Sequence, residues 1–225
     1  MKKLKVSLLI LVLAIFMSCD KEDSNIEKIP SLLNSPETIS TGITYTSFKV
    51  KGKVITEEGE NVTEKGVCWS TNPNPTINDN KLISENNDFD LTINNLITNK
   101  TYYFRSYAIN QIGVGYGSVQ STQTLSLENT VWKFSSVYSP TNFLIESTIN
   151  FYADGTTKFD EIGPGQGYFI TYGTWTLNGN TLTYKWNSAD PNNPEYLYTG
   201  TLSGMTMSGI FTHPTIPGTW TAIQL

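Results

Sequence analysis

Short alternating apolar runs separated by turn residues constrain the fold of this 225-residue chain more than any other feature. No long stretch carries apolar residues at positions i, i+3 and i+4, the spacing of an amphipathic helix. The runs instead alternate with a period of two, as in "SFKVKGKVI" at 47–55, and Gly, Asn, Asp and Pro punctuate them. This period places successive side chains on opposite faces of a strand. The sequence therefore predicts an all-β protein.

The second half of the chain carries eight such runs in succession. They cover 131–138, 143–153, 156–162, 167–177, 180–187, 195–203, 205–213 and 218–225. Tight turns join several of them, and the Asp-Gly and Asn-Gly pairs in "ADGT" and "LNGN" are strong hairpin signals. "LSGM" at 202–205 is a third such turn. Short turns pair neighbouring strands in order, and eight strands in order can close into a barrel without edges. We therefore predict an eight-stranded up-and-down β-barrel over 129–225, with a two-sheet sandwich as the alternative.

The alternation also predicts what lies inside this barrel, because it directs four of the five tryptophans and a tyrosine to one interior. The candidate ligand-binding residues are Trp132, Trp175, Tyr184, Trp186 and Trp220. A small eight-stranded barrel either encloses one ligand or is filled by its own side chains. The sequence leaves both possibilities open. If a pocket exists, these rings suit a small apolar ligand or a glycan.

Three segments of the second half, "GTWTLNGNTLTY", "GTLSGMTMSGIF" and "GTWTAIQL", resemble the lipocalin-like domains of the calycin group. The likeness lies in the Gly-x-Trp openings, the "GN" hairpin and the late Gly-Thr-Trp strand. It implies a lipocalin-like β-barrel.

Residues 31–125 have the size and texture of one β-sandwich, and the texture changes at about 126–129, where we place the domain boundary. Leu96 precedes Tyr102 by six residues. This spacing is typical of the tyrosine corner of Greek-key sandwiches, in which the tyrosine hydroxyl bonds to the backbone of the preceding loop.

The segments "GVCWSTNPNPTI", "LITNKTYYFRSYAIN" and "GVGYGSVQSTQT" of this first domain resemble fibronectin type III modules. The resemblance implies a β-sandwich that serves as a spacer or makes protein contacts. Alternation from Tyr102 directs Tyr103, Arg105 and Tyr107 outward, which makes them a candidate contact surface. Cys68 lies in a predicted strand and is interpreted as a small core residue.

The N-terminus, "MKKLKVSLLILVLAIFMSC", begins with three lysines and continues with an apolar run too short to cross a bilayer. The small Ser18 stands directly before Cys19. The stretch resembles a bacterial lipobox, and the "DKED" that follows resembles the surface-export signal of Bacteroidota lipoproteins. These resemblances imply a signal peptide over 1–18, a lipid on Cys19, a flexible tether over 19–30, and anchorage in the outer membrane at the cell surface. An ordinary secreted protein is the alternative.

The net charge argues against a nucleic-acid partner, and the cysteine content argues against a disulfide. Removal of residues 1–18 takes away three of the 15 basic residues and none of the 20 acidic ones, which leaves a net charge of −8. So acidic a chain repels nucleic acids and anionic head groups, so we expect no nucleic-acid partner. If Cys19 carries lipid, Cys68 has no partner for a disulfide.

The sequence offers little material for catalysis. The single histidine, His213, cannot build a multi-histidine metal site, and no nucleophile elbow or Walker loop occurs. "GPGQG" at 163–167 is expected to be a plain loop. Oxygen-rich loops at 77–88 and 190–195 could supply calcium ligands, but they fit ordinary turns equally well. We therefore expect no enzyme activity, no cofactor and no assigned metal site.

These expectations combine into one functional hypothesis. The chain is predicted to be a lipid-anchored binding lipoprotein of the cell envelope, with a spacer sandwich and a barrel that binds a ligand. Its partners would be the membrane, through the lipid, and a glycan, a small apolar molecule or an envelope protein. The alternative is a structural or assembly accessory that makes only protein contacts.

The anchor assignment is testable with Cys19→Ala. We expect this variant to lose incorporation of labelled palmitate and to leave the membrane fraction, because the acylated sulfur is gone. A variant that still labels and still sediments with membranes would contradict the assignment.

Overall fold

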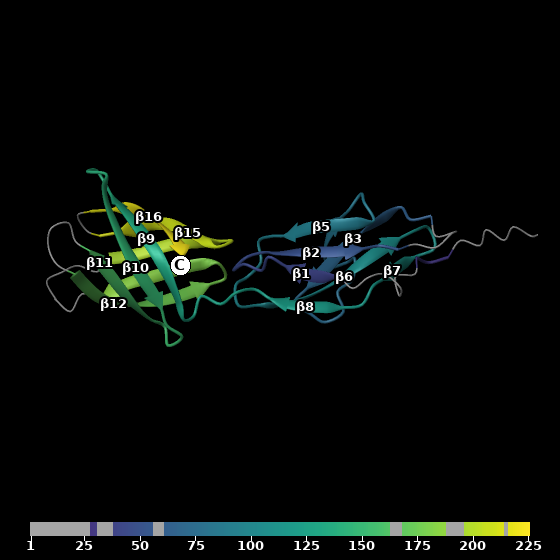
Figure 1. Cartoon of the computed structure of the whole chain (residues 1–225), viewed down its shortest axis with the longest axis horizontal. Helices are drawn as coiled ribbons and strands as arrows, with labels where there is room; N and C mark the ends of the chain where they lie inside the picture. Colours follow the sequence, from purple (N-terminus) through teal and green to yellow (C-terminus); the bar gives the residue numbers. More distant parts are fainter. Residues whose placement is uncertain (1–27, 31–37, 56–60, 163–167, 188–195, 214–215) are drawn as a thin grey trace, which may run out of the picture.

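The computed structural model describes residues 28–30, 38–55, 61–162, 168–187, 196–213 and 216–225, and every regular element in them is a β-strand. The strands form two bodies that lie end to end (Figure 1). The first holds β1 (Ile39–Thr41), β2 (Phe48–Lys53), β3 (Glu64–Ser70), β4 (Asn80–Ile83), β5 (Asp88–Ile93), β6 (Thr101–Ile109), β7 (Val114–Tyr116) and β8 (Gln120–Gln123). The second holds β9 (Thr130–Tyr138), β10 (Phe143–Phe151), β11 (Thr156–Ile162), β12 (Tyr168–Asn178), β13 (Thr181–Asn187), β14 (Tyr196–Ser203), β15 (Thr206–Thr212) and β16 (Gly218–Gln224).

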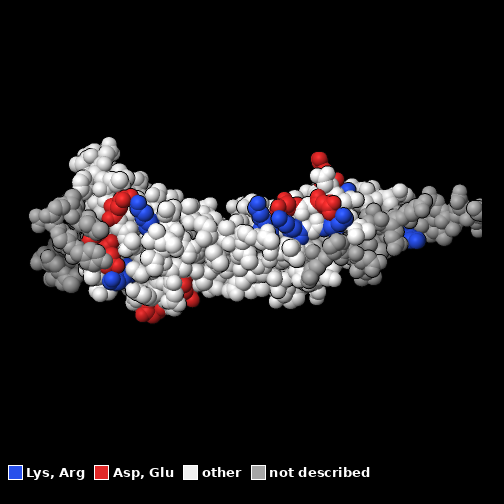
Figure 2. Space-filling view, viewed as in Figure 1, with Lys and Arg blue, Asp and Glu red and all other residues white. Residues whose placement is uncertain are grey.

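The first body is a sandwich of two antiparallel sheets. One sheet has the order β1-β2-β5, and the other has the order β4-β3-β6-β7, with β8 also paired to β6. This is a fibronectin type III-like arrangement, as the sequence predicted. Alternation works as expected on β2, where Phe48 and Val50 are buried between the sheets. The lysines of β2 alternate with these residues and face outward. Lys51 and Lys53 pair with Asp90 and Asp88 of β5, and Figure 2 shows basic and acidic side chains next to one another on the surface of the sandwich.

The tyrosine corner predicted at Tyr102 is present. The backbone N–H of Ile97 donates a hydrogen bond to the Tyr102 hydroxyl over 3.0 Å, and Leu96 is buried beside it. The bond pins the loop that leads into β6, so it orders the crossover between the two sheets.

The second body is a closed eight-stranded antiparallel barrel in which each strand pairs with its neighbours in sequence and β16 closes on β9. All eight predicted runs are strands. The three tight turns contain Gly155, Gly179 and Gly204, whose φ angles of +81°, +60° and +59° lie in the region that favours glycine. Closure leaves no strand edge for another chain to pair with. The fold class predicted from the sequence is therefore confirmed.

The described part of the segment predicted as a tether, residues 28–30, lies against the sandwich. The Asn110 side chain donates to the Lys28 carbonyl, Ile29 lies close to Gly113, and Pro30 is buried against Gly115. These contacts correct the expectation of a free linker up to residue 30. The signal peptide and Cys19 lie outside the described residues. Within the described ranges, no helix has the length and apolar character needed to span a membrane.

Tyr102→Phe tests the corner. The substitution removes the acceptor of the Ile97 N–H, and we expect the free energy of unfolding to fall by about 1–3 kcal/mol. Urea denaturation of the full chain measures it. Tyr103→Phe is the control, because that half-buried ring points to the other face of β6. Equal losses in the two variants would contradict the structural role of the corner.

Candidate functional site

The middle of the barrel is filled by its own side chains. Trp132, Tyr184 and Trp220 are at most 1% exposed and pack into one cluster with phenylalanines from neighbouring strands. Phe134, for example, stacks on Trp220 with ring centroids 4.9 Å apart and an interplanar angle of 16°. Alternation correctly directed the tryptophans inward, but it could not tell a lined pocket from a filled core. These three candidate ligand-binding residues therefore belong to the core, and only Trp175 and Trp186 reach the ends of the barrel.

The end of the barrel that faces the sandwich is closed by a residue of the sandwich. Tyr45 is fully buried, and its ring lies 5.3 Å from that of Trp132, centroid to centroid. Burial raises the pKa of the Tyr45 hydroxyl, although a hydrogen bond to Thr130 opposes the shift. Leu127, in the connection between the domains, is buried in the same cluster. The hydrophobic core of the barrel is therefore completed by the other domain.

Hydrogen bonds from two hairpin turns of the barrel hold this junction. The Asn180 side chain donates to the Leu96 carbonyl over 2.7 Å and accepts from the Thr98 N–H over 3.3 Å. The Gly204 N–H donates to the Thr46 hydroxyl over 2.7 Å, and its carbonyl accepts from the Tyr45 N–H. The turns that the sequence identified as hairpin signals thus also bind the sandwich.

Trp175 lies at the rim of this junction. It is half-buried, and its indole N–H donates to the Tyr152 carbonyl. A groove of about 310 Å³ opens beside it, between the two domains. The groove is lined by Ile97, Thr98, Asn99, Ser126, Leu127, Glu128, Trp175, Leu177 and Gly179.

Aromatic rings stack across three strands at the opposite end of the barrel. Trp186, Tyr196 and His213 come from β13, from β14 and from the residue after β15. The Tyr196 ring centroid lies 4.8 Å from that of Trp186 and 4.3 Å from that of His213. Phe211 and Tyr138 lie next in this group of aromatic rings, with ring centroids 4.9 Å apart. We call this end, defined by Tyr138, Glu161, Trp186, Tyr196 and His213, the distal mouth.

The distal mouth contains a carboxylate that faces the barrel interior. Glu161 follows Thr157 and Phe159 on the inward face of β11, and both of those are buried. Burial raises the pKa of the half-buried Glu161 carboxyl. Burial, with smaller contributions from Tyr196 and Glu161, also raises the pKa of Tyr138 to about 12. Among described residues, no hydrogen bond or ion pair to the Glu161 carboxylate is present.

Two further polar atoms on this part of the barrel lack partners. The Trp186 indole N–H and the Thr171 hydroxyl are buried and make no hydrogen bond within the described part of the chain. Buried polar groups are normally satisfied. Because Trp186 belongs to the distal mouth, an added polar molecule would find there both a hydrogen-bond donor and the Glu161 carboxylate.

Sequence reasoning found only part of the distal mouth. Trp186 was named as a candidate, whereas His213 was treated as a residue without a role and Tyr138, Glu161 and Tyr196 were missed. Alternation along β11 carried a signal for Glu161, because an acidic residue continues the inward series of Thr157 and Phe159. The other members come together only because the barrel closes.

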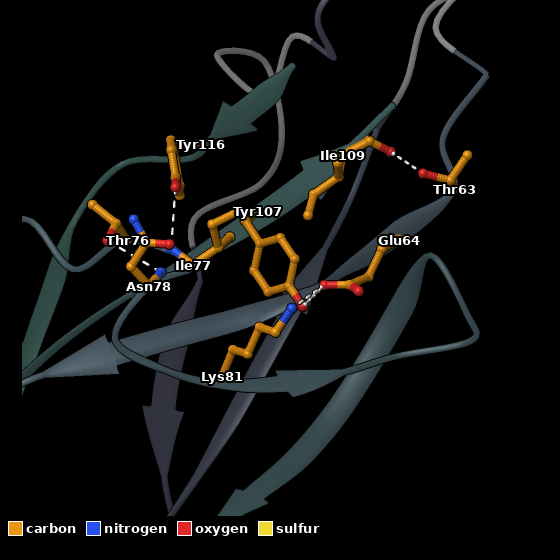
Figure 3. Close-up of polar contacts among 9 residues, drawn as sticks. All are labelled: Thr63, Glu64, Thr76, Ile77, Asn78, Lys81, Tyr107, Ile109 and Tyr116. Atoms are coloured by element: carbon orange, nitrogen blue, oxygen red, sulfur yellow. Dashed lines mark hydrogen bonds and ion pairs between the residues drawn. The ribbon is translucent and has the colours of Figure 1, made fainter. Parts of the chain in front are cut away.

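The proposed contact surface of the sandwich is largely covered. Tyr107 is fully buried on the outer face of β6, where its hydroxyl donates to Glu64 over 2.9 Å and Lys81 pairs with the same carboxylate over 2.7 Å (Figure 3). The Arg105 guanidinium lies 3.9 Å from the centroid of the Tyr116 ring. The expectation that Tyr107 is exposed was therefore wrong, because a charged pair caps its ring.

Cys68 is a small buried residue, as the sequence predicted, and its thiol lies 3.5 Å from the Pro75 carbonyl oxygen. It is fully buried, and burial raises the pKa of its thiol to about 11. A thiol with a raised pKa is a weak nucleophile at neutral pH.

The possible calcium loops receive no support from the structure. In the first loop, Asp79 accepts hydrogen bonds from the backbone and side chain of Thr76, which is ordinary turn geometry. The second loop, 190–195, and the "GPGQG" segment lie outside the described residues. In the ranges that are described, no three His, Cys, Asp or Glu side chains are grouped as metal ligands.

Comparison with known proteins identifies no family for this chain. No protein-family model matches the chain, and no curated protein matches its sequence. A crystal structure of the FN1-FN3 domains of chicken CNTN1 is similar over 84% of this chain and 97% of that one, with 10% identity and a TM-score of 0.31. So low a TM-score supports no argument, and the fold assignment rests on the strand order given above.

Tyr45→Ala tests whether the sandwich completes the barrel. Removal of this ring leaves a cavity against Trp132, and we expect the unfolding free energy of the barrel to fall by about 3–5 kcal/mol. Urea denaturation followed by tryptophan fluorescence measures it, since four of the five tryptophans lie in the barrel. Tyr172→Ala is the control, because that ring is 62% exposed and its loss should cost at most about 0.5 kcal/mol. Similar losses in both variants would mean that the barrel core is independent of the sandwich.

Proposed function

We propose that this protein is a lipid-anchored binding lipoprotein of the cell envelope, displayed on the outer membrane, whose ligand binds at the distal mouth of the barrel. The observation that carries the proposal is the contrast between the two ends. One end is closed by Tyr45 and Leu127, whereas the other presents a half-buried carboxylate and unpartnered polar atoms among stacked rings. Ligand sites are mostly apolar and contain a few polar groups that orient the ligand.

The position of the distal mouth suits an anchored receptor. Residues 28–30 lie against the β6–β7 turn, at the end of the sandwich farthest from the barrel (Figure 1). A lipid on Cys19 would therefore hold the sandwich near the membrane and direct the distal mouth away from it. In this proposal the sandwich is a spacer, and the hydrogen bonds of Asn180 and Gly204 keep the barrel oriented on it.

We propose a binding role without catalysis and without a nucleic-acid partner. The sequence has a single histidine and contains neither a nucleophile elbow nor a Walker loop. The acidic balance of the chain opposes binding to phosphate backbones.

One observation favours the alternative of an assembly accessory. An apolar pocket of about 370 Å³ lies beside the β9–β10 turn, lined by Tyr138, Ser139, Pro140, Thr141, Phe143 and Ile216. Phe143 and the neighbouring Leu144 are 47% and 53% exposed. Exposed apolar patches of this kind also serve protein contacts.

A matched pair of variants tests the proposed site. We would screen the full chain by thermal shift against neutral glycosides, fatty acids, aryl carboxylates and aryl ammonium compounds, and measure the affinity of each hit by calorimetry. Trp186→Ala is expected to weaken binding by about tenfold or more, because tryptophan contacts dominate binding energy. Trp175→Ala, at the other end of the barrel, should leave the affinity unchanged.

If Trp175→Ala weakens binding and Trp186→Ala leaves the affinity unchanged, the ligand binds instead in the groove at the junction of the two domains. If none of the four compound classes shifts the melting temperature, the accessory role becomes the better account. Leu144→Ser would then be the variant to examine for lost protein contacts.

A further inference from the structure

The barrel carries its positive charges on the outside only. Three lysines and no arginine stand between residues 126 and 225, against seven acidic residues. Lys133, Lys158 and Lys185 each alternate with inward-facing neighbours and so face outward. Lys133 pairs with Glu146 over 2.8 Å and Lys158 with Asp160 over 2.9 Å. Lys158, which lies on β11 itself, and Lys133 are thus already neutralised on the outer surface.

The segments that follow β9, β11, β13 and β15 in the chain, 139–142, 163–167, 188–195 and 214–217, contain no lysine or arginine. Among the described residues of the distal mouth, His213 is the basic side chain, and a bound ligand is the other possible partner for the Glu161 carboxylate. The His213 ring is stacked on Tyr196, whose far neighbour is Trp186.

The surroundings of Glu161 favour a particular kind of partner. Tyr138 and Tyr196 both lie close enough for the carboxylate charge to raise their pKa values, after burial as the main cause. Aromatic faces attract cations through the ring quadrupole, most strongly where water is excluded. A half-buried carboxylate close to two tyrosines, at the same end of the barrel as Trp186, is therefore complementary to a positive group attached to an apolar body.

We propose that the ligand of the distal mouth is a small organic cation, an ammonium carried on a flat apolar body, with Glu161 as its counter-ion. The ammonium is expected to donate hydrogen bonds to the carboxylate, and the apolar body to lie against the Trp186 ring and the edge of the Tyr196 ring, since both faces of Tyr196 are covered by Trp186 and His213. This inference depends on the proposed function, because it names the ligand class of the same site. An anionic ligand is disfavoured, since it would meet the Glu161 carboxylate and, among the described residues of the distal mouth, neither a lysine nor an arginine.

A pair of probes with nearly the same shape and different charge tests the inference. We would titrate the full chain with 2-phenylethylammonium and with neutral 2-phenylethanol in a calorimeter, with 3-phenylpropanoate as the anionic probe. The ammonium is expected to bind about tenfold or more tightly than the alcohol, and the anion to bind most weakly. Glu161→Gln should remove the preference for the ammonium and leave the affinity for the alcohol unchanged.

Glu146→Gln is the matched control, because Glu146 lies on the outer surface and pairs with Lys133. It should leave all three affinities unchanged. The Glu161 variant is expected to fold, because an amide of the same shape replaces a carboxylate that lacks a cation within the described residues, and its melting temperature should equal or exceed that of the parent protein. A lower melting temperature would mean that the carboxylate has a structural partner, which would overturn the counter-ion role.

The remaining outcomes separate this inference from the proposed function. The alcohol or a neutral glycoside could bind at least as well as the ammonium while binding still requires Trp186. That result would overturn the inference that the ligand is a cation, and the binding site at the distal mouth would stand. An ammonium preference that survives Glu161→Gln also overturns the inference. If none of the probes binds, including those of the wider screen, both proposals fail.

Discussion

The narrow interior of a closed eight-stranded barrel is the constraint on which the rest of this structure depends. Once β16 pairs with β9, the inward side chains must share a space that they fill completely. Rings from opposite strands then stack on one another, as Phe134 does on Trp220. Close packing of this kind stabilises the fold, and Trp132, Tyr184 and Trp220 in the middle of the barrel are at most 1% exposed. We therefore place the proposed binding role at an end of the barrel.

The two ends of the barrel differ in how the core is shielded from solvent. Toward the sandwich, Tyr45 enters the barrel and hydrogen bonds from two hairpin turns hold the neighbouring backbone. This arrangement makes the two domains depend on each other, because the barrel core includes a ring from the first domain. At the other end, Glu161 and the Trp186 N–H remain without partners among the described residues. Unsatisfied polar groups lower stability, and proteins tend to keep them where function requires them.

Comparison of expectation with structure shows where local sequence information runs out. The eight strand runs, the Gly turns and the tyrosine corner were predictable, because each depends on residues close together in the chain. Tyr107 was misjudged, because its cover comes from Glu64 and Lys81, which lie far from it in the sequence. Trp132 and Trp220 were correctly directed inward, yet the sequence left open whether they line a pocket or fill a core, because packing depends on all eight strands at once.

The sequence by itself determined the all-β class, the division into two bodies and the inward face of each strand, since a period of two and a glycine turn act within a few residues. Only the tertiary structure decided that the barrel is filled, that the sandwich closes one of its ends, and that Glu161 shares the other end with Tyr196 and Trp186. Those outcomes arise from strand register, barrel closure and domain contact. Each of these joins residues tens of positions apart, and the charge or volume of one residue does not reveal what will lie opposite it.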